Sequence, residues 1–98
     1  MDIQHAFAKS LKTARKASGL TQEDFSIISS RTYLSTLERG LKNPTLEKVH
    51  DIAETMNVHP LTLLVLTYMQ MDKKQSIESI FRRVQREIAE ISKPHEQG

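Results

Sequence analysis

Apolar residues recur at helical spacing along this chain, and glycine and proline interrupt the pattern between segments. Residues 3 to 17 are typical: Ile3, Phe7, Leu11 and Ala14 follow one another at steps of four, four and three, which places them on one side of an α-helix. The sequence has no stretch of alternating apolar and polar residues, the pattern expected of a half-buried strand. An all-α fold made of short helices is therefore predicted.

Start and stop signals divide the first part of the chain into three helices. Gly19 ends the first, because glycine readily takes the left-handed conformation found at helix C-caps. Thr21 caps the second helix, which is predicted to end near Ser29. Ser30 is a suitable N-cap for the third helix, and Gly40 ends it.

Three more helices are predicted downstream. Thr45 caps the fourth, and Pro60 suits the first turn of the fifth. Residues 1 to 72 are expected to form one bundle, with residues 73 to 93 as an appended amphipathic helix. Residues 94 to 98 are expected to be a flexible tail.

Composition bounds the fold and its setting. The chain has 98 residues, of which 38% are apolar and 27% charged, enough for one soluble core. Without cysteine no disulfide framework is possible, and a reducing cytoplasm is the expected location. No signal peptide is expected, because residues 1 to 16 have no long apolar core and no small-residue cleavage pattern. No membrane partner is expected, because the most apolar run (residues 61 to 71) is about half of the ~20 residues that span a bilayer. The net charge of +2 does not by itself predict nucleic-acid binding.

The third predicted helix, within SSRTYLSTLERG (residues 29 to 40), has an unusual outward face. At ~100° per residue, Leu34 and Leu37 lie on one side. The other side has short hydroxyl groups with an arginine at each end: Arg31, Thr32, Ser35, Thr36 and Arg39. An ordinary solvated face would have long Lys and Glu side chains, although a merely solvated surface is the alternative interpretation.

Over roughly residues 7 to 66, the chain resembles the lambda-repressor-like helix-turn-helix family, also called the XRE or Cro/CI type. The resemblance rests on the GLTQED start of the second helix, the bridge ERG-x-x-x-P-T-L and the ending A-x-x-x-x-V-x-P-x-x-L. It implies a five-helix bundle whose third helix lies in the major groove of double-stranded DNA. The function it implies is a sequence-specific transcriptional regulator, most simply a homodimeric repressor on a pseudo-palindromic operator.

The resemblance assigns base contacts to the third helix. Arg31, Thr32 and Thr36 would contact bases, and Ser35 would contact either a base or a phosphate. Short side chains suit this place because the helix must approach base edges in a groove about 12 Å wide. Arginine at the N-terminal end can donate to guanine O6 and N7 together.

Phosphate contacts are expected on both sides of this helix. Gln22 would lie at the start of the second helix, where free backbone N–H groups favour an anion. The complete predicted set is Gln22, Tyr33, Arg39, Lys42, Asn43 and Thr45. Tyr33 could instead pack at the edge of the core, and Lys48 could be an ordinary solvated charge.

The resemblance also implies a buried ion pair between Arg15 and Glu38, which would fix the angle of the third helix. An exposed Glu38 is the alternative. The chain departs from the family pattern between Gln22 and Glu38, which are sixteen positions apart, fewer than usual. Residues 28 to 30 replace the usual glycine-containing turn, which puts the angle between the second and third helices in doubt.

The last predicted helix has a one-sided apolar stripe, which we call the seam. Its members follow at steps of four, three, four and three: Ile77, Phe81, Val84, Ile88 and Ile91. This is heptad spacing, but the segment is too short for a stable isolated coiled coil. It could fold back on the fifth helix or pair with a second copy of the chain. A homodimer interface formed by the seam with Leu63 and Leu66 is predicted.

No enzymatic site, metal or cofactor is expected. His5, His50, His59 and His95 lack metal-ligand spacing, and the sequence has no phosphate-binding glycine loop and no cysteine nucleophile. The alternative function is a helical protein-interaction module, an antitoxin-like or antirepressor-like partner that uses the fifth and sixth helices. The polar face of the third helix favours DNA binding.

Overall fold

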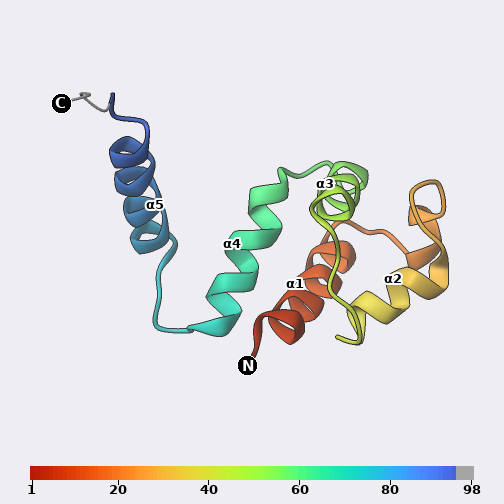
Figure 1. The fold of residues 1–98 in the computed structure, drawn as a ribbon. Coiled ribbons are helices and arrows are strands. Elements are labelled where there is room, and N and C mark those ends of the chain that lie inside the picture. The colour runs from red at the N-terminus through yellow and green to blue at the C-terminus, as the bar shows by residue number, and fades with distance from the viewer. Residues whose placement is uncertain (95–98) are drawn as a thin grey trace.

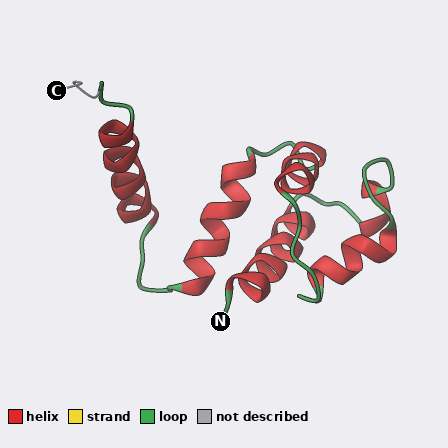
Figure 2. Ribbon diagram, viewed as in Figure 1, coloured by secondary structure: helices red, strands yellow, loops and turns green. Residues whose placement is uncertain are grey.

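The structure is a computed structural model that describes residues 1 to 94, and all regular structure in this range is helical (Figure 1; Figure 2). The elements are α1 (Ile3–Ala17), η1 (Gln22–Phe25), α2 (Arg31–Glu38), α3 (Leu46–Thr55), α4 (Pro60–Met71) and α5 (Ile77–Ile91). The all-α fold class is confirmed for the described residues. The predicted tail, residues 94 to 98, lies outside them apart from Pro94.

One hydrophobic core joins the first five elements. α4 packs against both α1 and α3, and α2 packs against α1 and η1. The largest fully buried apolar side chains are Phe25, Leu11, Leu34, Leu37, Ile52 and Leu63. Burying one such side chain stabilises a fold by about 1.5–3 kcal/mol. Core packing rather than helix propensity therefore holds α2, which has only eight residues.

The predicted caps Ser30 and Thr45 are confirmed by their hydrogen bonds. Ser30 Oγ accepts from the backbone N–H of Tyr33 at 3.0 Å, and Thr45 Oγ1 accepts from that of Lys48 at 3.1 Å. At the start of α4, His59 caps through its ring Nδ1. Each cap satisfies a backbone N–H that the helix itself leaves unpaired.

The prediction for the second helix is wrong in length. Instead of reaching Ser29, it is a single 3₁₀ turn, Gln22–Phe25, followed by turns over residues 26 to 29. Thr21 and Asp24 start it with a capping box. The next residues are Ser-Ile-Ile-Ser-Ser; serine hydroxyls compete for backbone groups, and β-branched isoleucines lose rotamer freedom in a helix. The described residues thus form five α-helices and one 3₁₀ turn, not six α-helices.

α5 lies away from α1, α2 and α3, beyond the turn at residues 72 to 76 (Figure 1). It packs against α4, and Ile80 is its buried residue. The radius of gyration is 15.7 Å, compared with about 13 Å for a compact chain of this length. The molecule is accordingly elongated, with extents of 54 × 30 × 23 Å.

Replacing Gly40 by alanine is expected to destabilise the protein more than the same change at Gly19. Both glycines have a φ of +73°, which costs other residues about 1–2 kcal/mol. This backbone cost is therefore the same for alanine at either position. A Cβ at Gly40 would also lie 2.8 Å from Cδ2 of His5, whereas a Cβ at Gly19 would have no neighbour within 4 Å. Displacing the His5 ring from this position would disturb its 2.8 Å contact with Asp2. Urea unfolding of both variants measures the difference, and equal losses would show that His5 moves without cost.

Candidate nucleic-acid interface

The outward face of α2 is the candidate contact surface. Leu34 and Leu37 are fully buried, so the opposite side of the helix points away from the core. The residues predicted to contact bases all lie at or near the surface: Arg31 and Thr32 are exposed, and Ser35 and Thr36 are half-buried. This face begins at the first residue of α2, where Arg31 follows the Ser30 cap.

The hydroxyl group of Thr36 is already committed as a donor. It donates to the backbone carbonyl of Thr32 at 2.7 Å. Towards an incoming group, Thr36 therefore offers acceptor lone pairs and a methyl group. In the major groove, adenine and cytosine present amino donors and thymine presents a methyl group. With this donation in place, Thr36 is suited to those edges, and a contact with the acceptor edge of guanine would require its hydroxyl to give up the bond to Thr32.

A buried ion pair anchors the C-terminal end of α2. Arg15 Nε donates to Glu38 Oε2 at 2.6 Å and Nη2 donates to Oε1 at 3.0 Å. The two side chains are 10% and 4% exposed. Arg15 Nη1 also donates to the carbonyl of Leu20 at 2.9 Å. This network connects α1, the start of η1 and the end of α2, and hydrogen bonding to Glu38 raises the pKa of Arg15 above its ordinary value.

Gln22 belongs to the same network. Its side-chain amide donates to Glu38 Oε1 at 3.1 Å, and the residue is half-buried at the start of η1. The amide nitrogen has two protons, so one remains for another acceptor. Contact between Gln22 and a phosphate stays a prediction.

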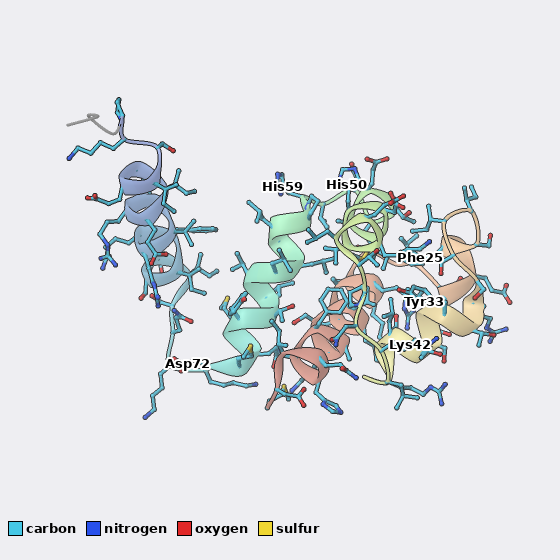
Figure 3. The ribbon with its side chains drawn as sticks, viewed as in Figure 1. Phe25, Tyr33, Lys42, His50, His59 and Asp72 are labelled. Atoms are coloured by element: carbon cyan, nitrogen blue, oxygen red, sulfur yellow. The ribbon has the colours of Figure 1, made fainter. Side chains whose placement is uncertain are left out.

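The loop after α2 is held by the first turn of α1. Gln4 Nε2 donates to the carbonyl of Gly40, whose α-carbon lies against the ring of His5. The predicted phosphate-contacting residues of this region are all exposed: Arg39, Lys42, Asn43 and Thr45. In Figure 3, Lys42 and Tyr33 lie on the side of the molecule away from α5.

Lys48 has a structural role that the sequence did not indicate. Its ammonium group donates to the carbonyl of Ile28 and lies 5.8 Å from the ring centroid of Tyr33. It therefore ties α3 to the turn that precedes α2. Tyr33 is half-buried and packs against the core, which agrees with the core-edge interpretation. No local pattern could have revealed the Lys48 contact, because its acceptor is a backbone carbonyl twenty positions away.

Arg31 forms an ion pair with an acidic residue that the sequence analysis did not single out. Arg31 Nη1 donates to Glu23 Oε1 at 3.1 Å, and the side chains are 69% and 72% exposed. Both residues line a hollow of about 380 Å³ together with Arg15, Thr21 and Gln22. The first residue of α2 is thus held against the second residue of η1.

The residues predicted for a dimer interface do not share one environment. Leu63 is fully buried in the core, so its assignment to an intermolecular surface is wrong; α4 turns this residue towards α1 and α3. Leu66 is half-buried and lines an open groove of about 380 Å³ between α4 and α5. The seam is exposed, from 43% at Val84 to 75% at Ile91.

Across residues 1 to 94, no cluster of three or more His, Cys, Asp or Glu side chains is arranged to hold a metal ion. None of the helices in this range is both long enough and apolar enough to cross a membrane.

A sequence profile of the family described as Helix-turn-helix matches residues 11 to 63, more than half of the chain. The chain belongs to the helix-turn-helix family. The family predicted from the GLTQED and ERG-x-x-x-P-T-L motifs is thereby confirmed. The matched residues run from α1 to the first turn of α4 and contain the whole of the candidate interface.

Two other proteins resemble this helix-turn-helix chain. An uncharacterized HTH-type transcriptional regulator of Sinorhizobium fredii, y4dJ, is 35% identical over 69 residues, which are 68% of this chain and 90% of that protein. The crystal structure of the clp gene regulator ClgR from Corynebacterium glutamicum has a TM-score of 0.70 at 21% identity, over 97% of this chain and 98% of that one. At this identity the second comparison concerns the fold alone, and the likeness includes α5.

Replacing Arg15 by alanine is expected to destabilise the protein by about 3–5 kcal/mol, because it leaves the Glu38 carboxylate buried without its counter-ion. Arg83→Ala is the matched control. Arg83 pairs with Glu87 at 3.3 Å, but those side chains are 66% and 50% exposed, so about 1 kcal/mol or less should be lost. Urea unfolding followed by circular dichroism gives both values. A loss at Arg15 no larger than that at Arg83 would contradict the anchoring role.

Proposed function

We propose that this helix-turn-helix chain reads operator DNA through α2, as a homodimeric repressor. At the coarser level, the family match and the likeness to the HTH-type transcriptional regulator y4dJ make the chain a DNA-binding transcriptional regulator. The observation that supports the finer proposal is the outward face of α2. That face is short and polar, begins with an arginine, and is held at a fixed angle by the buried Arg15–Glu38 pair.

In this proposal, α2 enters the major groove with its N-terminal end first. Arg31 donates to guanine O6 and N7. Thr36 accepts from an adenine or cytosine amino group or packs on a thymine methyl, since its own proton is given to Thr32. Thr32 and Ser35 complete the base-contacting face. The flanking strand phosphates are contacted by Gln22, Tyr33, Arg39, Lys42, Asn43 and Thr45.

The proposed homodimer rests first on the amount of exposed surface. The accessible surface is 7075 Å², whereas a compact monomer of 11.2 kDa exposes about 5,700 Å². The excess is about 1,400 Å², within the roughly 1,000–2,500 Å² that each partner of an obligate homodimer buries. A second copy of the chain is therefore an occupant of suitable size.

The position of the apolar side chains supports the same occupant. The groove between α4 and α5 is lined mostly by apolar residues: Leu61, Val65, Leu66, Met69, Ile77 and Phe81, with His59 and Thr62. The seam continues from this groove along α5. We propose that the groove and the seam, without Leu63, form a two-fold interface. Such a dimer would place two α2 helices about 34 Å apart on a pseudo-palindromic operator in the cytoplasm.

The test of sequence reading is selection of bound fragments from a random double-stranded DNA library at ~150 mM salt, where non-specific phosphate binding is weak. A two-fold-symmetric motif supports the whole proposal. Enrichment of a single half-site would contradict the homodimer and would still support a sequence-specific regulator. Failure to enrich any motif overturns sequence reading by α2.

On the selected operator, Arg31→Ala is expected to cost about 1–3 kcal/mol and to relax the preference at one base position. Lys42→Ala is the control, because a phosphate contact should weaken all sequences alike and reduce the salt dependence of binding. Fluorescence anisotropy with operator and scrambled duplexes measures both. Equal losses on the two duplexes for Arg31→Ala would exclude a base contact.

The change Ile88→Asp is expected to convert the dimer into monomers, because it places a charge within the apolar seam. Ala89→Asp introduces the same charge in the same turn of α5 but off the seam, and should leave the mass unchanged. Light scattering measures the mass of each variant. If Ile88→Asp keeps the mass of the parent protein, the seam does not join two chains.

A second candidate function is favoured by the same open groove: a protein-interaction module that binds an α-helix of another protein between α4 and α5. It predicts a monomeric chain in the light-scattering measurement and no motif in the DNA selection. The polar face of α2 has no role in this alternative.

A further inference from the structure

Three acidic residues lie between Thr21 and Thr45, the part of the chain proposed to face DNA: Glu23, Asp24 and Glu38. Each carboxylate contacts a different partner. That of Glu38 is buried against Arg15, and that of Asp24 accepts from the backbone N–H of Thr21 at 2.7 Å in the capping box. That of Glu23 contacts Arg31, which is a proposed base-contacting residue. Glu23 therefore differs from the other two because its partner is a residue proposed to contact DNA bases.

The Glu23–Arg31 contact is not needed for folding of either element that it joins. η1 is started by the Thr21–Asp24 box, and α2 is capped by Ser30. Because both side chains are largely exposed, such a pair adds little to stability. η1 is a single turn, and α2 begins after five intervening residues, 26 to 30. The Glu23 and Arg31 side chains meet across this connection.

The contact leaves Arg31 able to bind a base. Arg31 uses Nη1 towards Glu23, and a guanidinium has five N–H donors in a planar fork. The edge formed by Nε and Nη2 is available to two acceptors on one guanine. Glu23 thus orients the guanidinium while one edge of it stays usable.

Phosphates and guanine should respond differently to this arrangement. A phosphate must approach Arg31 against the negative charge of Glu23, which repels it. Guanine O6 and N7 belong to a neutral base and carry only partial negative charges, so Glu23 repels them less than it repels a phosphate. We propose that Glu23 determines selectivity, by orienting Arg31 for guanine and weakening its use as a non-specific phosphate contact. This inference rests on the proposed function of α2.

The test uses the 98-residue chain with Glu23→Gln, which keeps the size of the side chain and one acceptor oxygen and removes its charge. Affinity is measured for the selected operator and for a scrambled duplex between ~100 and ~300 mM salt. The scrambled duplex should bind about three- to five-fold more tightly and with a steeper salt dependence, because Arg31 becomes available to phosphates. Operator affinity should change less, so the ratio of the two affinities falls.

Two controls separate this role from a general effect of charge. Glu47→Gln removes the same charge from the first turn of α3, where the residue is exposed, and it should leave the ratio nearly unchanged. In the Arg31→Ala background, Glu23→Gln should produce no further increase in scrambled-duplex binding. An equal fall in the ratio for Glu47→Gln, or an undiminished effect without Arg31, overturns the proposal.

The outcomes also distinguish this inference from the function on which it rests. A duplex of arbitrary sequence can replace the scrambled operator if no motif is selected. A gain in binding that depends on Arg31 would then support the repulsion of phosphates by Glu23, while its role in selectivity would fall together with the proposed function. If a motif is selected but Glu23→Gln changes neither affinity, the function stands and the selectivity role falls. If the protein binds neither duplex, both fall.

Discussion

The orientation of α2 depends on one buried carboxylate. Glu38 receives two hydrogen bonds from Arg15 and a third from Gln22, so α1, η1 and α2 meet at a single charged side chain. Charge-assisted contacts of this kind are strongly directional, and their loss in a buried place is costly. α2 is therefore positioned from its C-terminal end, and its N-terminal end is free to be polar. A helix of eight residues with two buried leucines can therefore hold its outward hydroxyl groups in a fixed orientation.

The connection before α2 is irregular, and α2 can keep its orientation because Glu38 fixes its C-terminal end. In place of a full second helix there is one 3₁₀ turn and the turns over residues 26 to 29. Lys48 compensates by donating to the carbonyl of Ile28 from α3 and lying over the ring of Tyr33. The connection also has backbone hydrogen bonds of its own, because the N–H groups of Ile28 and Ser29 both donate to the carbonyl of Phe25.

Whether a feature could be predicted from the sequence depends on how far apart in the chain its interacting residues lie. The bounds of most helices were predictable because caps such as Ser30 and Thr45 act within three residues. The Arg15–Glu38 pair was expected only from the family resemblance, since no local rule connects residues 23 positions apart. Leu63 was misassigned because α4 is apolar on nearly every side, so the sequence does not show which side meets α1. The contacts of Lys48 and Glu23 arise from how the shortened connection folds, which depends on the whole bundle.

α4 has two apolar sides with different neighbours. Its inner side, with Leu63 and Thr67, is buried in the core, and its outer side forms a wall of the groove. No loop separates these two surfaces, so they share the backbone of one helix. Any partner that covers the groove adds burial to a helix that already supports α1, and α1 provides Arg15. Occupancy of the groove and resistance of the bundle to unfolding are therefore thermodynamically linked. In the homodimer proposed above, this linkage would make the melting temperature rise with protein concentration.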